Sequence, residues 1–164
     1  VSVLNRWFDA INQPIILEGG VINKYLGDAV FVIFGLDGHP SPACAALRAA
    51  RGIKEATRKL NSEFAREGGP ELCIGIGMHH GPVTAGVLGT KDRLEYTVIG
   101  ATVNLASRLE GLSKNVPGGV LLSRDLIEAA KKEGGSMPPC TSLGSVSVRG
   151  MDTPVPVATL DGPA

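Results

Sequence analysis

Residues 96–110, YTVIGATVNLASRLE, constrain the fold more than any other stretch of the chain. The stretch begins as a short apolar β run, turns at a glycine and continues with the spacing of an amphipathic helix. Asn104 and Arg108 are four residues apart and share one stripe of that helix, while Leu105 and Leu109 lie about a quarter turn away. The helix can therefore face a core with its leucines and present an amide and a guanidinium to a neighbouring surface. The plain alternative is an amphipathic helix with two exposed polar residues that carry no chemistry.

The length and charge of the chain limit what it can be. At 164 residues it suits one domain with a sizeable core, so residues 1–164 are expected to form a single domain. Its 16 basic and 16 acidic residues cancel, so no overall field attracts nucleic acid or an anionic membrane, and nucleic acid is not an expected partner.

Three widely spaced cysteines with no CxxC pair disfavour a disulfide framework or a zinc site and favour a reducing compartment. We therefore expect a cytoplasmic location. No apolar run reaches the length of a membrane span, and Val1 enters a helical pattern directly, so neither a span nor a leader is expected in this chain. Any membrane tether would lie outside it.

The first half of the chain alternates helical and β patterns. A Gly-Asp pair separates two β runs, as in a two-residue hairpin, and a Ser-Pro pair starts the clearest helix. The predicted elements are a helix at 1–13, strands at 21–26 and 29–34 turning at Gly27-Asp28, and a helix from Ser41-Pro42 that ends at 68–70.

The second half predicts more strands than helices. The first expected elements are a hairpin of 72–79 and 83–88 around Gly81-Pro82, an exposed charged loop at 89–95, and the strand and helix of 96–110. A strand at 120–122 and a helix that is capped by Ser123 and ends near 132 follow. The last elements are a loop at 134–140 and a strand pair at 143–149 and 155–160.

This order of elements predicts an α+β fold, with helices on one face of a mainly antiparallel sheet. A leading helix placed between hairpins suggests that one strand precedes residue 1 and is missing from the sequence. With that strand the core would be a ferredoxin-like βαββαβ unit, followed by a C-terminal extension of a helix and a β-hairpin.

Two residues of the first hairpin are candidate site residues. Asp28 at the hairpin tip is either a common turn former or a carboxylate presented to a metal ion, which prefers hard oxygen ligands. Lys24, in an otherwise apolar run, is either a solvated strand residue or a donor to a ring nitrogen, because its ammonium can only donate.

Two other patterns are set aside. His79 and His80 are neighbours on a predicted strand and point to opposite faces, so a structural role is favoured over chelation of one ion. The glycines of residues 75–81 do not match GxGxxG, and they precede a strand rather than a helix, so this is not a dinucleotide fingerprint.

Taken together, the ordered segments resemble the catalytic domain of class III nucleotidyl cyclases, and most closely bacterial adenylyl cyclases. The resemblance keeps order and spacing over about residues 15–160. The matching segments are residues 20–30, 34–35, 75–83, 85–89, 96–100 and 103–110.

The resemblance implies a role for each matched residue. Asp28 falls on a metal-binding aspartate, Lys24 on the lysine that recognises the base, and Thr97 on its partner in reading the purine. Asn104 falls on the residue that orients the ribose and Arg108 on the transition-state arginine.

More loosely, Arg149 falls near a basic residue that contacts the terminal phosphates. The resemblance further implies two Mg²⁺ or Mn²⁺ ions per site, a head-to-tail homodimer with shared sites, and regulatory domains tethered outside this chain.

Two positions depart from the family pattern. The family's first metal aspartate lies on a strand ahead of the first helix, and no such strand precedes Val1; Asp9, inside the helical pattern, is a poor substitute. Many adenylyl members carry aspartate where this chain has Thr97, whose hydroxyl can still accept a hydrogen bond from the adenine amino group.

The sequence therefore predicts an adenylyl cyclase that converts ATP to cyclic AMP and pyrophosphate. The first rival is a guanylyl cyclase, which Lys24 disfavours because a carboxylate there would suit guanine. The second rival is a catalytically silent, cyclase-like regulatory or dimerisation module. The missing upstream aspartate favours the silent module, whereas the presence of Asp28, Asn104 and Arg108 opposes it.

Overall fold

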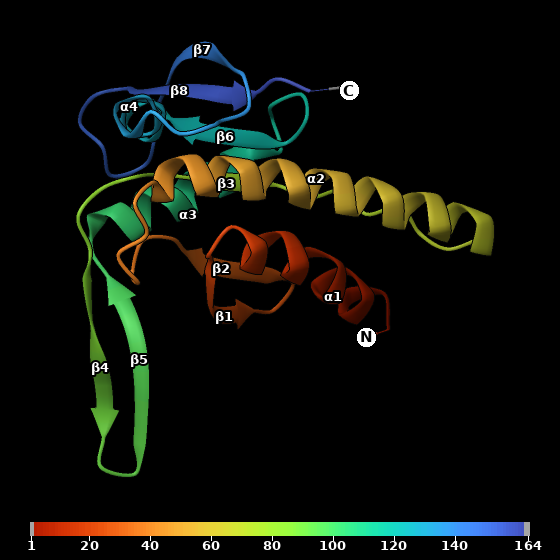
Figure 1. Ribbon diagram of the computed structural model, residues 1–164, viewed down its shortest axis with the longest axis horizontal. Helices are drawn as coiled ribbons and strands as arrows, with labels where there is room; N and C mark the ends of the chain where they lie inside the picture. Colours follow the sequence, from red (N-terminus) through yellow and green to blue (C-terminus); the bar gives the residue numbers. More distant parts are fainter. Residues whose placement is uncertain (1, 163–164) are drawn as a thin grey trace. The chain divides into compact units, whose positions relative to one another are not determined.

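The structure, a computed structural model, describes residues 2–162 and has the predicted α+β fold (Figure 1). The chain forms two compact units, each described here by itself. Unit 1 comprises the residues up to 74 together with 133–138, and unit 2 comprises 75–132 together with the residues from 139 onward. The single-domain expectation for residues 1–164 stays a prediction.

Unit 1 consists of two helices and one hairpin. Its elements are α1 (Ser2–Leu17), β1 (Val21–Leu26), β2 (Ala29–Ile33) and α2 (Pro42–Glu67). Strands β1 and β2 pair antiparallel and Leu26 lies opposite Ala29, which confirms the hairpin and its turn at Gly27-Asp28.

The two helices of unit 1 pack along each other, with a hydrogen bond from Trp7 and a charged cluster around Arg6. The Trp7 indole N–H donates to the Thr57 hydroxyl at 3.0 Å. Arg6 pairs with Glu67 at 2.6 Å, and its guanidinium lies over the ring of Phe64 at 4.4 Å from the centroid. Phe64 is itself fully buried, so the cation covers the end of an apolar core.

The first helix is longer than expected. The sequence predicts an end at about residue 13, but α1 continues through Pro14 to Leu17. A proline in a helix costs a hydrogen bond. Here Ile15, which follows it, is completely buried, and the apolar area removed from water offsets that loss.

The start of α2 also differs from expectation. Ser41 holds the N-cap position but makes no side-chain capping hydrogen bond. Instead, the Glu133 carboxylate accepts hydrogen bonds from the backbone N–H groups of Ala43 and Cys44, each at 2.9 Å. A carboxylate satisfies two open donors of the helix and suits its positive end. At the other end Gly68 adopts the left-handed conformation and stops the helix, as predicted.

Unit 2 is built on a four-stranded mixed sheet and a separate two-stranded ribbon. Its elements are β3 (Ile76–Met78), β4 (Thr84–Thr90), β5 (Arg93–Ile99), α3 (Ala101–Ser113), β6 (Val120–Ser123), α4 (Arg124–Glu133), β7 (Cys140–Val146) and β8 (Val155–Leu160). The sheet order is β3-β6-β8-β7, with β3 and β6 parallel and the other neighbours antiparallel.

The predicted hairpin of 72–79 with 83–88 is wrong. Strand β3 pairs with β6, whereas β4 pairs with β5 across a turn at Lys91-Asp92, so the predicted loop at 89–95 is largely strand. The charged residues 91–95 read as a loop because the ribbon is exposed, and an exposed strand shows no apolar alternation. The last strand pair is also shifted, since β7 begins at Cys140 and ends before the expected 149.

Helix α3 covers β3 at a position where only glycine fits. A Cβ atom at Gly77 would overlap the Glu110 backbone and lie 2.6 Å from the carbonyl oxygen of Ala106. This close approach sets α3 onto the sheet. The core beneath it consists of Leu105, Leu109, Leu121, Val148, Val155 and Val157.

No helix among residues 2–162 combines the length and the apolar character that crossing a bilayer requires.

Candidate active site

The first two candidates share the hairpin of unit 1. Asp28 occupies the β1–β2 turn and is exposed, whereas Lys24 on β1 is half-buried. The register shifts between Ile22 and Lys24, so Asn23 is an extra residue that forms a β-bulge. A bulge changes the face to which the following side chains point, and bulges often re-aim a side chain near a functional site. Nothing in the sequence signalled this bulge.

Helix α3 has the two faces that its sequence predicts. Leu105 and Leu109 are 8% and 0% exposed, whereas Asn104 and Arg108 are exposed. Among residues 2–162 the Arg108 guanidinium makes no hydrogen bond or ion pair, so its donors remain available to a ligand.

The loop between β7 and β8 brings the Gly150 backbone to Arg108. Arg149 and Gly150 form a turn, and the Gly150 backbone lies against the Arg108 guanidinium. The turn that carries the exposed Arg149 therefore lies against Arg108, from a distant part of the chain. The sequence analysis aligned Arg149 with the family only loosely and did not identify Gly150. The available signal for Gly150 was a glycine directly after an arginine, between two predicted strands.

Thr97 lies near the end of β5, opposite Gly86 of β4, and is half-buried. Four residues further on, Ala101 begins α3, so Thr97 belongs to the strand that leads into the helix of Asn104 and Arg108. Thr97, Asn104, Arg108 and Arg149 all belong to unit 2, whereas Lys24 and Asp28 belong to unit 1. The candidates are thus divided between the two units.

His79 has the structural role that was favoured for it. Its Nδ1 lies 2.7 Å from the Ser123 hydroxyl, whose oxygen accepts the Leu126 N–H at 3.2 Å and caps α4. Neutral imidazole can accept the Ser123 proton there, which completes the network. Burial lowers the pKa of His79 below its ordinary value of 6.5; the Asp125 carboxylate opposes this shift and His80 adds to it.

The lowered pKa of His79 makes stability depend on pH. The unfolded chain binds a proton at His79 more readily than the folded chain. The contribution of neutral His79 to the free energy of unfolding is therefore fully present above the ordinary pKa of about 6.5, and it is lost as pH falls below that value. We expect the melting temperature of a His79→Gln variant to fall less than that of the wild type between pH 7 and pH 5. Thermal melts across this range test this, with His80→Gln as the control. Equal pH slopes for His79→Gln and the wild type would contradict the prediction.

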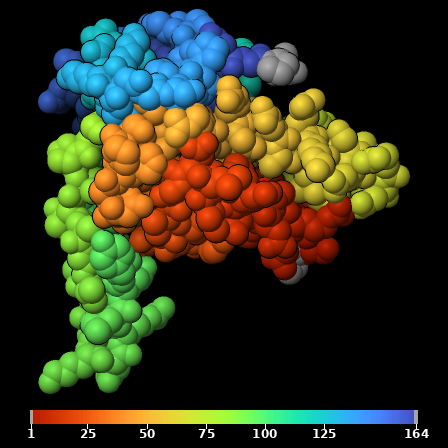
Figure 2. All heavy atoms as spheres, in the orientation of Figure 1, coloured from red at the N-terminus to blue at the C-terminus, as the bar shows by residue number. Residues whose placement is uncertain are grey.

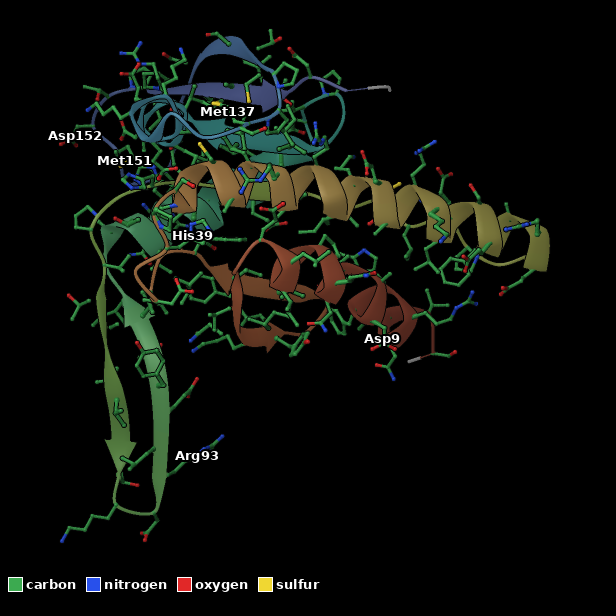
Figure 3. The ribbon with its side chains drawn as sticks, in the orientation of Figure 1. Asp9, His39, Arg93, Met137, Met151 and Asp152 are labelled. Carbon is green, nitrogen blue, oxygen red and sulfur yellow. The ribbon has the colours of Figure 1, made fainter. Side chains whose placement is uncertain are left out.

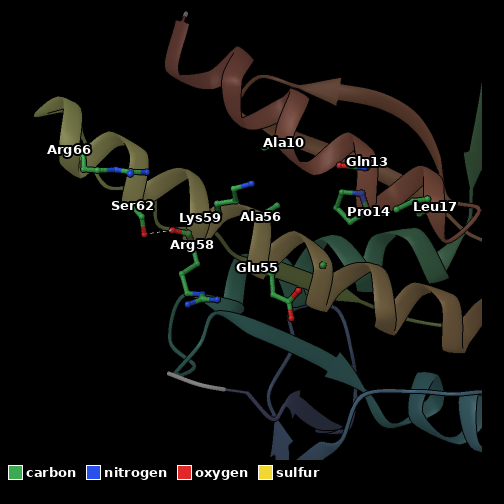
Figure 4. A pocket seen from close by; sticks show the side chains of 11 residues that line it. Ala10, Gln13, Pro14, Leu17, Glu55, Ala56, Arg58, Lys59, Ser62 and Arg66 are labelled. Carbon is green, nitrogen blue, oxygen red and sulfur yellow. Dashed lines mark hydrogen bonds between the residues drawn. The ribbon is translucent and has the colours of Figure 1, made fainter.

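A shallow groove lies elsewhere in unit 1, between α1 and α2 (Figure 4). Pro14 and Leu17 line one side of it, and Lys59 and Arg66 line the other. None of the candidate residues contributes to it, so the groove has no part in the candidate site.

A metal ion would find an incomplete set of ligands in residues 2–162. No group of three or more His, Cys, Asp or Glu side chains there could hold a metal. Asp28 offers one carboxylate, and a hard divalent cation prefers several oxygen ligands. The described residues therefore fit such an ion only in part.

Comparisons with known proteins agree on one family. The sequence matches the family described as "Adenylate and Guanylate cyclase catalytic domain" over residues 1–158. It is 41% identical to the uncharacterized protein Rv1318c of Mycobacterium tuberculosis over 160 residues, which cover 96% of this chain and 28% of that protein. The chain thus spans little more than a quarter of that relative's length.

Two solved structures are similar over nearly the whole chain. The adenylyl cyclase CyaB from P. aeruginosa has a TM-score of 0.87 at 28% identity and is covered to 82%, with 99% of this chain. The guanylyl cyclase Cya2 has a TM-score of 0.84 at 29% identity and is covered to 80%, again with 99% of this chain. The chain belongs to the family of adenylate and guanylate cyclase catalytic domains.

Proposed function

We propose that this cyclase domain is an adenylyl cyclase that converts ATP to 3′,5′-cyclic AMP and pyrophosphate. The observation that carries the proposal is the α3 surface, on which Asn104 and Arg108 are exposed and the turn of Arg149 lies against Arg108. An exposed arginine beside a turn that carries a second arginine suits a polyphosphate, because a guanidinium offers several N–H donors in a planar fork.

The reaction needs positioning and charge stabilisation more than covalent help from the protein. The ribose 3′-oxygen forms a bond to the α-phosphorus, the bond from that phosphorus to the oxygen bridging to the β-phosphate breaks, and the hydroxyl proton leaves. Asn104 orients the ribose, and Arg108 stabilises the charge that grows on the phosphoryl oxygens. Arg149 holds the terminal phosphates, which leave as pyrophosphate.

Class III cyclase domains generally use divalent metal ions. We propose Asp28 as one ligand of two Mg²⁺ or Mn²⁺ ions, since its carboxylate is exposed at the tip of a turn. The phosphates of ATP would supply further oxygen ligands. When bound, such ions activate the attacking oxygen and stabilise the leaving oxygen.

A homodimer with shared sites is supported by the ribbon of β4 and β5. Figure 2 shows the ribbon's atoms, and its apolar side chains are open to solvent: Val87 is 59% exposed, Leu94 68% and Tyr96 51%. Large apolar side chains gathered on an exposed ribbon mark an interaction surface. We propose that a second copy of the domain covers it, by a two-fold interface.

The shared-site proposal predicts complementation. If Lys24 of one subunit and Asp28 of the other serve the same site, a heterodimer of Lys24→Ala with Asp28→Ala has one site that is intact at both positions. Each variant alone should be inactive, whereas each heterodimer in their mixture should have about half of the activity of a wild-type dimer, because one of two equivalent sites is restored. Activity of mixtures whose heterodimer content is measured in parallel tests this. Inactive mixtures that contain heterodimers would contradict it.

An adenylyl cyclase and a guanylyl cyclase are about equally similar to this chain, so overall similarity does not distinguish ATP from GTP. The proposed substrate preference therefore rests on Lys24 and Thr97. Lys24 can donate to adenine N1 but can also reach guanine O6, and the Thr97 hydroxyl either accepts or donates. An unpaired buried donor costs about 1–3 kcal/mol. We therefore expect kcat/KM for ATP to exceed that for GTP by roughly ten- to a hundredfold.

The experiment compares kcat/KM for both nucleotides in the full-length protein and in Thr97→Asp. The variant should keep its use of ATP and discriminate more sharply, since a carboxylate only accepts hydrogen bonds. Equal or better use of GTP by the wild type would favour the guanylyl alternative. Absence of turnover with either nucleotide would favour the silent module, and the domains tethered to this chain would then be its targets.

A further inference from the structure

The turn of residues 148–151 presents a bare backbone to Arg108. The Met151 N–H donates to the Val148 carbonyl at 3.1 Å, and Gly150 has a φ of +80°, as at the third position of a type II turn. Figure 3 labels Met151, which ends the turn. A Cβ atom at Gly150 would lie 2.6 Å from Nη1 of Arg108 and 3.2 Å from Cζ. The guanidinium thus occupies the space that any side chain at position 150 would need.

The turn is held in place by the core beneath α3. Val148, two residues before Gly150, is 3% exposed and belongs to the same buried cluster as Leu105 and Leu109. Those leucines flank Arg108 along the helix. Packed side chains therefore fix the distance between the turn and α3, and they hold the Gly150 backbone in place beside Arg108.

Arg108 needs such a surface because nothing else among residues 2–162 orients it. Its guanidinium makes no hydrogen bond or ion pair there, and its side chain is exposed. A long arginine side chain has many rotamers, and each one that is not productive lowers the fraction of molecules ready to react. The backbone of the 148–151 turn excludes some of the Arg108 rotamers by steric overlap, and it leaves the N–H donors of the guanidinium unoccupied.

We propose that Gly150 is a positioning residue for the cyclase reaction: its missing side chain lets the Arg108 guanidinium lie against the 148–151 turn, in the orientation that meets the phosphoryl oxygens. This inference rests on the proposed role of Arg108. The same turn carries Arg149, so one rigid support serves both cations. Position 150 favours glycine for two separate reasons: the positive φ, and the Arg108 guanidinium, which a side chain there would displace.

These two reasons can be separated by a matched control. Gly144 in β7 has a φ of +79°, and a Cβ atom there would meet nothing within 4 Å. Gly150→Ala and Gly144→Ala therefore carry the same kind of backbone strain, but only the first displaces Arg108. In the full-length protein we expect similar melting temperatures, a kcat lowered about tenfold or more by Gly150→Ala with KM little changed, and a kcat within about twofold of wild type for Gly144→Ala.

Gly150→Asn provides a second variant, because asparagine tolerates positive φ better than alanine but is larger. Displacement of Arg108 predicts a kcat at or below that of Gly150→Ala, whereas backbone strain alone predicts a milder effect. Equal kcat for Gly150→Ala and Gly144→Ala would overturn the inference, as would a milder effect of asparagine.

Combination with Arg108→Ala separates failure of the inference from failure of the proposed function. Once the guanidinium is gone, Gly150→Ala should lower the residual kcat no further. A further loss as large as in the wild type would show that Gly150 acts independently of Arg108 and would overturn the inference alone. An Arg108→Ala variant with unchanged kcat would overturn the proposed role of Arg108 and this inference with it.

Discussion

Replacement of Asp28 by alanine is expected to reduce cyclisation below detection while leaving the fold intact. Asp28 is exposed in a two-residue turn and accepts no hydrogen bond from any residue among 2–162, so its loss should change the free energy of unfolding by no more than about 0.5 kcal/mol. The activity should disappear because the carboxylate is the proposed ligand of the catalytic ions.

The measurement is turnover of ATP by the full-length protein with Mg²⁺ and with Mn²⁺, together with a thermal melt. Asp9, an exposed aspartate on α1, provides the control, since Asp9→Ala removes the same charge from unit 1 and should leave turnover unchanged (Figure 3). Unchanged Mn²⁺-supported turnover in Asp28→Ala would remove Asp28 from the site.

The second large effect is expected at Arg108. Arg108→Ala should lower kcat by roughly a hundredfold or more, on the order of 3 kcal/mol, because a preorganised donor is lost where charge develops in the transition state. The effect on KM should be smaller, since the contact strengthens between the bound substrate and the transition state. The melting temperature should change little, because the guanidinium is exposed and makes no hydrogen bond within residues 2–162.

Single-turnover and steady-state rates of Arg108→Ala and Arg108→Lys test this. The lysine variant keeps the charge but lacks the planar fork, so it should recover only part of the rate. Lys114→Ala removes another exposed cation at the end of α3 and should leave kcat near the wild-type value. A change in KM alone would show that Arg108 only binds ATP in its ground state.

Helices and the first hairpin could be predicted from the sequence because their signals are local. The Gly27-Asp28 turn, the Gly68 end of α2 and the two faces of α3 all depend on residues within a few positions of each other. Strand pairing in unit 2 could not be predicted in this way. The partner of β3 is β6, more than forty residues away. The glycines after β3 are also compatible with a hairpin to the next β segment, and the local sequence does not distinguish the two pairings.

In the candidate site, too, local features could be predicted from the sequence and contacts between distant residues could not. The residue types and spacing of Asn104 and Arg108 are visible in the sequence, and so are Lys24 and Asp28. The Arg108 contact with Gly150 is not visible, because it depends on how a loop forty residues later packs against a helix. The bulge at Asn23 is hidden for a similar reason, since it exists only in the pairing of two strands.

The contact of Glu133 with the first turn of α2 has a consequence for the order in which the chain folds. The carboxylate and the two N–H groups that it caps are 90 and 89 residues apart in sequence. A growing chain therefore makes α2 long before its cap exists, and closing so large a loop is slow compared with forming a helix. Until residue 133 has emerged from the ribosome, the beginning of α2 is open to fraying, so the first unit reaches its final stability only after most of the second has been synthesised.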